Sequence, residues 1–96
     1  MEERGINREA LYSIGKGFYR EPEESPAFSD VTIRFRTLRE DVDRVLLYLP
    51  DEQQIYPMQL ESSDHYFDYY EMEIKLKDKP LHYYFRIEKG KEVIHY

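Results

Sequence analysis

Two stretches in the last third of the chain alternate between apolar and polar residues, and this alternation constrains the fold more than any other feature. Successive side chains of a β-strand point to opposite faces, so a repeat of two residues indicates a strand that buries one face. The sequence therefore predicts strands over 67–77 and 81–87. The apolar or aromatic positions that share one face are Tyr70, Met72, Ile74 and Leu76 in the first strand and Leu81, Tyr83, Phe85 and Ile87 in the second.

A two-residue turn at 78–79 would join these strands as an antiparallel hairpin. In that register Phe85 lies opposite Met72 on the apolar face, and Glu71 lies opposite Arg86 on the polar face. A shift of one residue would turn every apolar side chain to the wrong face. We therefore expect a single hairpin with this register.

A second tight turn, at Lys89 and Gly90, would extend the hairpin into a three-stranded meander. Glycine adopts a positive φ without strain, as such a turn requires. Phe85 then lies opposite Ile94, again on the apolar face. The meander needs a second apolar layer to cover this face.

The middle of the chain supplies that layer. The stretches 31–37 and 43–49 show the same alternation, and Pro50 ends the second, because proline cannot donate to a strand ladder. Residues 55–60 indicate a short edge strand, and the mainly polar residues 61–65 indicate a loop. Two antiparallel sheets packed face to face predict an all-β fold, an immunoglobulin-like antiparallel β-sandwich.

The length of the chain, 96 residues, suits one domain. We expect residues 1–96 to form a single β-sandwich in which 31–96 supply the main strands. Residues 1–30 are expected to form an extended N-terminal segment with a short strand at 9–13. Ten Tyr and five Phe favour strands, because aromatic side chains pack well on a pleated surface.

The charge and the hydrophobic pattern exclude several classes of partner. The formal net charge of −6 disfavours binding to nucleic acid, whose phosphates are also negative. The longest apolar run, Val45–Leu49, is far shorter than the ~20 residues of a membrane-spanning helix. No secretory leader follows Met1, which favours a cytoplasmic location, although removal of a leader from a longer precursor would leave the same sequence.

No group of residues in the sequence indicates catalysis. The chain has no cysteine and therefore no thiol nucleophile or thiolate metal site. Glu71 and Glu73 share the polar face of a predicted strand and should stay solvated, whereas a glycosidase needs two carboxyl groups across a cleft. Asp64, His65 and Asp68 form a cluster that suits a solvated turn better than a metal site. We expect no catalytic centre, no metal site and no cofactor.

Exposed aromatic residues are the remaining candidates for function, because sugar-binding modules stack flat aromatic side chains against pyranose rings. Tyr56, Tyr69 and Tyr84 fall outside the predicted apolar face. In the predicted meander Tyr69 and Tyr84 lie on one outer face, about 13 Å apart at ~3.3 Å per residue. They therefore do not form one continuous platform.

Several segments also match, in order and spacing, the motifs of a known domain. These segments are Asn7-Arg8-Glu9-Ala10-Leu11-Tyr12, Ile33-Arg34-Phe35-Arg36-Thr37, Asp41-Val42 with Val45, Pro57-Met58, Phe67-Asp68-Tyr69-Tyr70 and Leu81-His82-Tyr83-Tyr84-Phe85. As a set they resemble the N-terminal domain of neopullulanases, cyclomaltodextrinases and maltogenic amylases. That domain is the carbohydrate-binding module of family 34, attached to enzymes of glycoside hydrolase family 13.

The resemblance implies a β-sandwich whose catalytic barrel lies beyond Tyr96. It implies a non-catalytic domain of an α-glucan-degrading hydrolase that contributes to carbohydrate binding, dimerisation and the shape of the substrate cleft. The implied partners are an α-glucan, maltooligosaccharide or cyclodextrin, the catalytic domain of the parent enzyme and a second subunit. The alternatives are a purely structural dimerisation and packing domain without sugar contact, or an unrelated protein-interaction sandwich.

The resemblance also implies where sugar would be contacted. Relatives present an aromatic residue to the substrate cleft from the loop after the second long strand. The nearest aromatic residue here is Tyr56, with Asp51 and Gln54 available to hydrogen-bond hydroxyl groups. We therefore expect Tyr56, Asp51 and Gln54 to form the main contact, with Tyr84 and Tyr69 as further carbohydrate-binding candidates.

Overall fold

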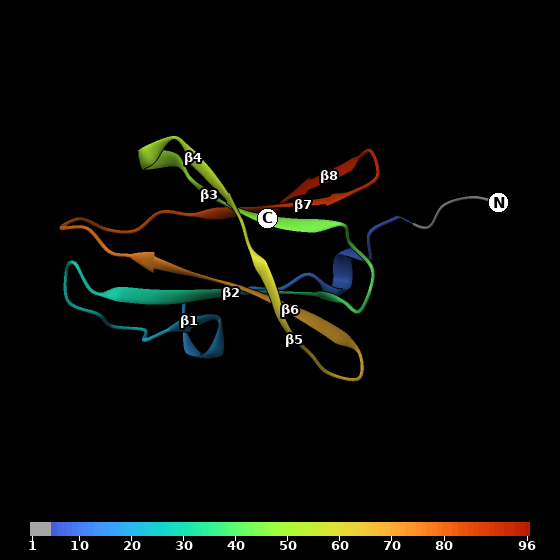
Figure 1. Cartoon of the computed structure of the whole chain (residues 1–96), viewed down its shortest axis with the longest axis horizontal. Helices are drawn as coiled ribbons and strands as arrows, with labels where there is room; N and C mark the ends of the chain where they lie inside the picture. The colour runs from blue at the N-terminus through green and yellow to red at the C-terminus, as the bar shows by residue number, and fades with distance from the viewer. Residues whose placement is uncertain (1–4) are drawn as a thin grey trace.

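The computed structural model describes residues 5–96 and consists of two four-stranded antiparallel sheets packed face to face (Figure 1). Sheet A has the order β1-β2-β6-β5 and contains β1 (Arg20–Glu21), β2 (Asp30–Leu38), β6 (Phe67–Lys75) and β5 (Gln59–Ser63). Sheet B has the order β4-β3-β7-β8 and contains β4 (Gln54–Pro57), β3 (Arg44–Leu49), β7 (Tyr84–Lys89) and β8 (Glu92–His95). The predicted all-β sandwich is confirmed.

Three short 3-10 helices complete the described part of the chain: η1 (Arg8–Ala10), η2 (Gly17–Tyr19) and η3 (Pro50–Glu52). None of the helices within residues 5–96 is long and apolar enough to cross a membrane. In place of the predicted strand at 9–13, the structure has η1 followed by a single bridge between Tyr12 and Arg36. The part of that N-terminal prediction that concerns residues 1–4 lies outside the described residues.

The core lies between the sheets and centres on two phenylalanine rings. Phe35 of β2 and Phe85 of β7 are 0% and 3% exposed, and their ring centroids are 4.5 Å apart. The other buried side chains of the main strands include Val31, Ile33, Val45, Leu47, Leu49, Tyr70, Ile74, Ile87 and Ile94. These are the inward faces that the alternation predicts, so the assignment of the buried face is confirmed for β2, β3, β6, β7 and β8.

The predicted hairpin between 67–77 and 81–87 is wrong. β6 pairs with β2 and β5 in sheet A, whereas β7 pairs with β3 and β8 in sheet B. Phe85 therefore lies opposite Leu47 and not opposite Met72. Two apolar rows can meet side by side in one sheet or face to face across a core, and alternation alone does not distinguish the two.

The strands of the middle region are also divided between the sheets. β2 belongs to sheet A and β3 to sheet B, and the predicted strand over 55–60 is split into β4 and β5. Met58 lies at this crossing, and its amide donates to the Val45 carbonyl at 2.8 Å. Residues 61–63, predicted as loop, form the end of the edge strand β5, whose register is interrupted between Leu60 and Ser62.

The last hairpin forms as predicted, but its register differs by two residues. Ile87 lies opposite Ile94, and Lys89 lies opposite Glu92, so the turn contains Gly90 and Lys91. Gly90 has the positive φ, 56°, that the turn requires. A shift of two residues leaves each side chain on its predicted face, which is why alternation could not detect it.

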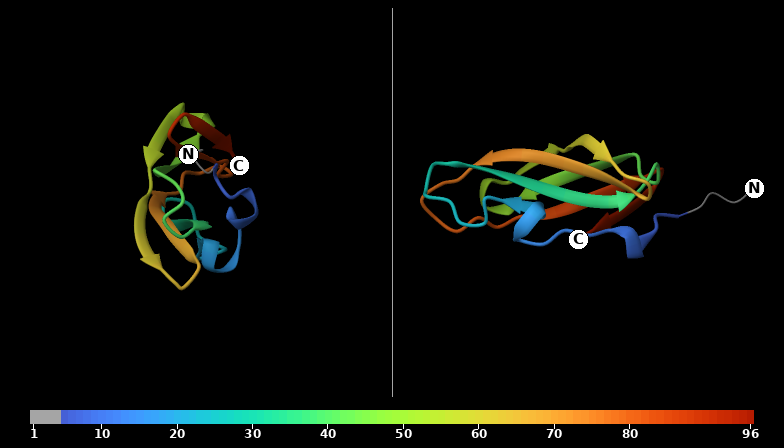
Figure 2. Two further views of the ribbon diagram at one scale, coloured as in Figure 1. Left: turned by 90° about the vertical axis from the view of Figure 1, so that its right-hand side faces the viewer. Right: turned by 90° about the horizontal axis from the view of Figure 1, so that it is seen from below.

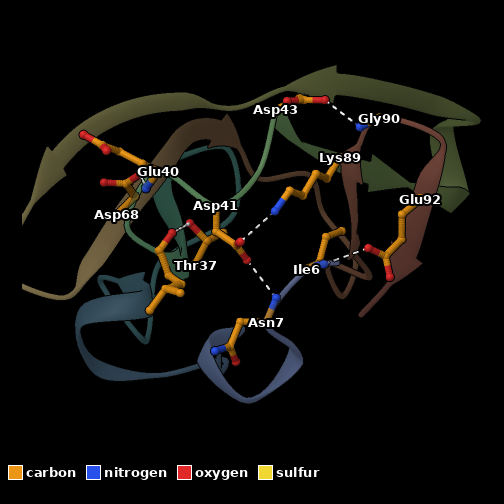
Figure 3. A network of polar contacts seen from close by, with 11 residues as sticks. Ile6, Asn7, Thr37, Glu40, Asp41, Asp43, Asp68, Lys89, Gly90 and Glu92 are labelled. Atoms are coloured by element: carbon orange, nitrogen blue, oxygen red, sulfur yellow. Dashed lines mark hydrogen bonds and ion pairs between the residues drawn. The ribbon is translucent and has the colours of Figure 1, made fainter. Parts of the chain in front are cut away.

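One buried carboxylate and one half-buried carboxylate attach the N-terminal segment to the sandwich (Figure 3). The side chain of Asp41, which is 5% exposed, accepts hydrogen bonds from the Asn7 amide at 2.7 Å and from Lys89 Nζ at 3.0 Å. Glu92 accepts from the Ile6 amide at 2.7 Å. Both views in Figure 2 show the C-terminus beside this segment.

We expect Phe85→Ala to lower the free energy of unfolding by about 3–5 kcal/mol, because it empties the centre of the core. Chemical denaturation followed by circular dichroism measures this change. Val93→Ala, at an exposed position of β8, is the control and should cost less than about 1 kcal/mol. A loss of similar size in both variants would contradict the core described above.

We expect Asp41→Ala to cost about 3 kcal/mol, because the Asn7 amide and the Lys89 ammonium both lose their acceptor. Adding Lys89→Met should restore part of this loss, since it removes the unpaired charge. A double-mutant cycle in urea measures the coupling, with the exposed Glu24→Ala as the control. Strictly additive effects would contradict the role given to the ion pair.

Candidate functional site

One hollow of the sandwich contains the aromatic residue that the sequence predicts as the main sugar contact. We call it the Tyr56 hollow. It has a volume of about 590 Å³, and its lining includes Phe28, Tyr56, Met72 and Leu76. Tyr56 lies opposite the buried Leu47 in the ladder between β3 and β4, and its half-buried ring packs against the core. The hollow is therefore mainly apolar. The prediction that Tyr56 falls outside the apolar face is wrong, because it shares the inward face of sheet B with Leu47.

Charged and aromatic side chains also contribute to the Tyr56 hollow. Lys77 Nζ and Glu52 Oε1, both from lining residues, are 2.6 Å apart. The ring of Phe28 is 64% exposed, and its φ of 67° is unusual for a bulky residue. The next residue, Ser29, accepts a hydrogen bond from the Leu76 amide at 2.8 Å, which attaches this loop to the end of β6. The hollow thus combines two aromatic rings with two carboxylates, those of Glu52 and Glu73, and two ammonium groups, those of Lys75 and Lys77.

The structure separates the other two predicted contacts of this region from Tyr56. Asp51 lines a neighbouring hollow, where its Oδ2 lies 3.1 Å from His82 Nδ1. Gln54 is exposed at the start of β4, opposite Leu49. Neither is among the lining residues of the Tyr56 hollow, whereas Glu52 is.

Tyr69 and Tyr84 lie on opposite outer faces of the sandwich, so the predicted placement on one face is wrong. The reason is that β6 and β7 belong to different sheets. Tyr84 packs against Tyr48 on sheet B, with ring centroids 4.7 Å apart. Tyr69 packs against Phe18 on sheet A at 5.4 Å, with nearly perpendicular rings.

A hydrogen bond to Asp64 fixes the hydroxyl group of Tyr69. The hydroxyl donates to Asp64 Oδ2 at 2.6 Å, and the amides of Tyr66 and Phe67 donate to Oδ1. Burial and this bond raise the pKa of Tyr69 to about 12. The same bond, together with the two amides, lowers the pKa of Asp64. At neutral pH the hydroxyl of Tyr69 is therefore a neutral donor, and the carboxylate of Asp64 is a charged acceptor.

Of the carboxylates considered for catalysis or metal binding, Glu71, Asp64 and Asp68 have structural partners. Glu71 accepts from Arg34 Nε at 2.9 Å, and not from Arg86 as predicted, because Arg34 lies beside it on β2. Asp68 is buried and accepts from the Glu40 amide and the Ser63 hydroxyl. Within residues 5–96, no three Asp, Glu or His side chains are grouped as a metal site would require.

Sequence reasoning did not identify Phe18 or Phe28 as candidate site residues. Both lie in the segment before β2, in η2 and in the loop that follows β1, where no strand periodicity applies. One feature of the sequence could have pointed to them, because each is a large aromatic residue in a segment rich in turn formers. Phe18 stands between Gly17 and Tyr19, and Phe28 stands between Pro26 and Ser29.

Comparison with known proteins relates this sandwich to a family of N-terminal domains and to one solved structure. The family model described as "Alpha amylase, N-terminal ig-like domain" matches residues 18–96. A solved structure titled "Cyclomaltodextrinase" is similar over 92% of this chain, with a TM-score of 0.75 and 24% sequence identity. The chain spans only 16% of the length of that protein. Among curated proteins, none matches the sequence.

We expect Tyr69 to ionise only near its raised pKa of about 12, well above the ordinary value of 10.0. The stability that its neutral hydroxyl contributes is present below the ordinary pKa and is lost as the pH rises through the folded value. The Cζ chemical shift of a chain labelled with ¹³C-tyrosine measures this ionisation. Asp64→Asn should lower the pKa of Tyr69, because it removes the negative charge. An unchanged value would contradict the role given to Asp64.

Proposed function

Because the chain belongs to the family described as the alpha amylase, N-terminal ig-like domain, we propose that it is a non-catalytic domain of an α-glucan-degrading glycoside hydrolase. A separate catalytic domain of that protein hydrolyses α-1,4 and α-1,6 glucosidic bonds. The present domain contributes to carbohydrate binding, to dimerisation and to the shape of the substrate cleft. The likeness in fold to a longer protein named a cyclomaltodextrinase supports this proposal.

The observation that carries the proposal is the chemistry of the Tyr56 hollow. A pyranose ring has apolar C–H faces and a rim of hydroxyl groups. The rings of Tyr56 and Phe28 suit the faces, and the charged groups of Glu52 and Lys77 suit the hydroxyls. An α-glucan, a maltooligosaccharide or a cyclodextrin offers such rings without any charge of its own.

The expected affinity of the domain is low. Tyr56 is half-buried, so only part of its ring is available to a ligand. Few polar groups converge on one position, and the ligand must lose rotational freedom when it binds. We therefore propose a dissociation constant of about 1 mM, or roughly 4 kcal/mol. Such a site assists a catalytic domain and does not capture sugar by itself.

The outer face of sheet B favours a second candidate function, packing without sugar contact. Ile55, Tyr84 and Val93 are all large apolar residues that remain exposed there. Apolar residues gathered on one surface often mark contacts with other proteins. In this alternative the domain acts only by packing on the catalytic domain or on a second subunit.

We expect maltoheptaose to shift the amide signals of residues 52–56 and 72–77 in the ¹⁵N-labelled chain. Tyr56→Ala should weaken this binding at least fivefold, because it removes the ring against which a sugar stacks. Tyr66→Ala, at an exposed aromatic residue that does not line this hollow, is the matched control and should leave the affinity unchanged. If neither maltoheptaose nor β-cyclodextrin shifts any signal at 10 mM, the carbohydrate-binding proposal fails and the packing alternative stands.

A further inference from the structure

A row of aromatic rings crosses the outer face of sheet A, away from the Tyr56 hollow. Tyr12, Tyr19, Phe18 and Tyr69 follow one another with centroid distances of 5.1, 5.2 and 5.4 Å. Each neighbouring pair is nearly perpendicular, which is a favourable arrangement for aromatic rings. The row ends in a shallow hollow lined by Phe18, Tyr19 and Tyr69.

Phe18 is held firmly although it is exposed. The guanidinium of Arg34 lies over its ring, 4.5 Å from the centroid. Arg34 is itself fixed by Glu71 at 2.9 Å, by Glu21 at 3.1 Å and by the Phe18 carbonyl at 2.8 Å. Phe18 is nevertheless 44% exposed, so part of its surface remains open to a ligand. A ring that is already immobile loses little entropy when a ligand packs on it.

The polar side chains of this hollow are suited to a neutral ligand that carries hydroxyl groups. Ser62, Ser63 and Asp64 line it together with Tyr69. Three hydrogen bonds orient the Asp64 carboxylate, which can accept about four, so it retains capacity for a ligand hydroxyl. The negative charge of Asp64 disfavours phosphate and other anions. An uncharged pyranose ring, with one apolar face and several hydroxyl groups, fits this combination.

We propose that this hollow is a second saccharide-binding site, in which one glucosyl unit of an α-glucan packs on the exposed part of the Phe18 ring. The inference rests on the proposed function, since it assumes that α-glucan is the ligand of the domain. The two hollows share no lining residue. Two weak sites on one domain bind a chain long enough to reach both more tightly than a short oligosaccharide, through effective concentration.

The test is a titration of the ¹⁵N-labelled chain with maltoheptaose, in which each hollow is followed by its own amide signals. We expect signals of residues 17–19 and 62–64 to shift with a dissociation constant of about 1 mM. Phe18→Leu keeps an apolar side chain but removes the flat ring. It should raise the dissociation constant reported by these signals at least fivefold. Phe18→Trp should retain them. Tyr66→Ala is the matched control: it removes an exposed ring that does not line the hollow but keeps the amide that donates to Asp64, so it should leave the affinity unchanged.

The outcomes separate this inference from the proposed function. Shifts confined to residues 52–56 and 72–77 would overturn the second site and leave the proposed function standing. The absence of any shift would overturn both. Shifts of residues 17–19 caused by a proline-rich peptide and not by maltoheptaose would overturn the saccharide site in favour of a peptide site. If Phe18→Leu does not fold, the titrations of the unmodified chain and of Phe18→Trp still decide between these results.

Discussion

The contact between Phe35 and Phe85 is the interaction on which the rest of the structure depends. It joins the central strands of the two sheets, since β2 and β6 are central in sheet A and β3 and β7 in sheet B. The chain crosses between the sheets after β2, after β4 and after β6. Each sheet therefore contains strands that are separated along the chain by strands of the other sheet. Such pairing between distant segments makes the fold cooperative and slow to form compared with a series of hairpins.

The sequence was sufficient to predict which side of each strand is buried, but not which strands are neighbours. Alternation depends only on the contrast between core and water, and Leu47 offers Phe85 the same apolar surface that Met72 would have offered. The connection between β6 and β7 includes Pro80, which cannot donate to a ladder, and it is long enough to cross to the other sheet. A register shift of two residues, as at Ile87 and Ile94, is equally invisible to a pattern with a period of two.

The candidate site was predictable only where a family resemblance pointed to it. That resemblance directed attention to Tyr56, and the structure places this residue in a hollow together with Phe28. Phe18 and Phe28 carry no periodic signal, because they reach the surface from a 3-10 helix and a loop. Their positions depend on tertiary contacts, such as the guanidinium of Arg34 over Phe18, which no local pattern encodes.

The interruption in β5 has a consequence for the behaviour of the domain at high concentration. β5 is an edge strand, and all five of its residues are exposed, including Leu60. A regular edge of this kind would present free amides and carbonyls to the edge of a second molecule. The bulge between Leu60 and Ser62 bends the strand and breaks the spacing of those groups, and Glu61 adds charge at the same place. The domain can thus leave one side of sheet A open to water without offering a template on which further chains could assemble into fibrils.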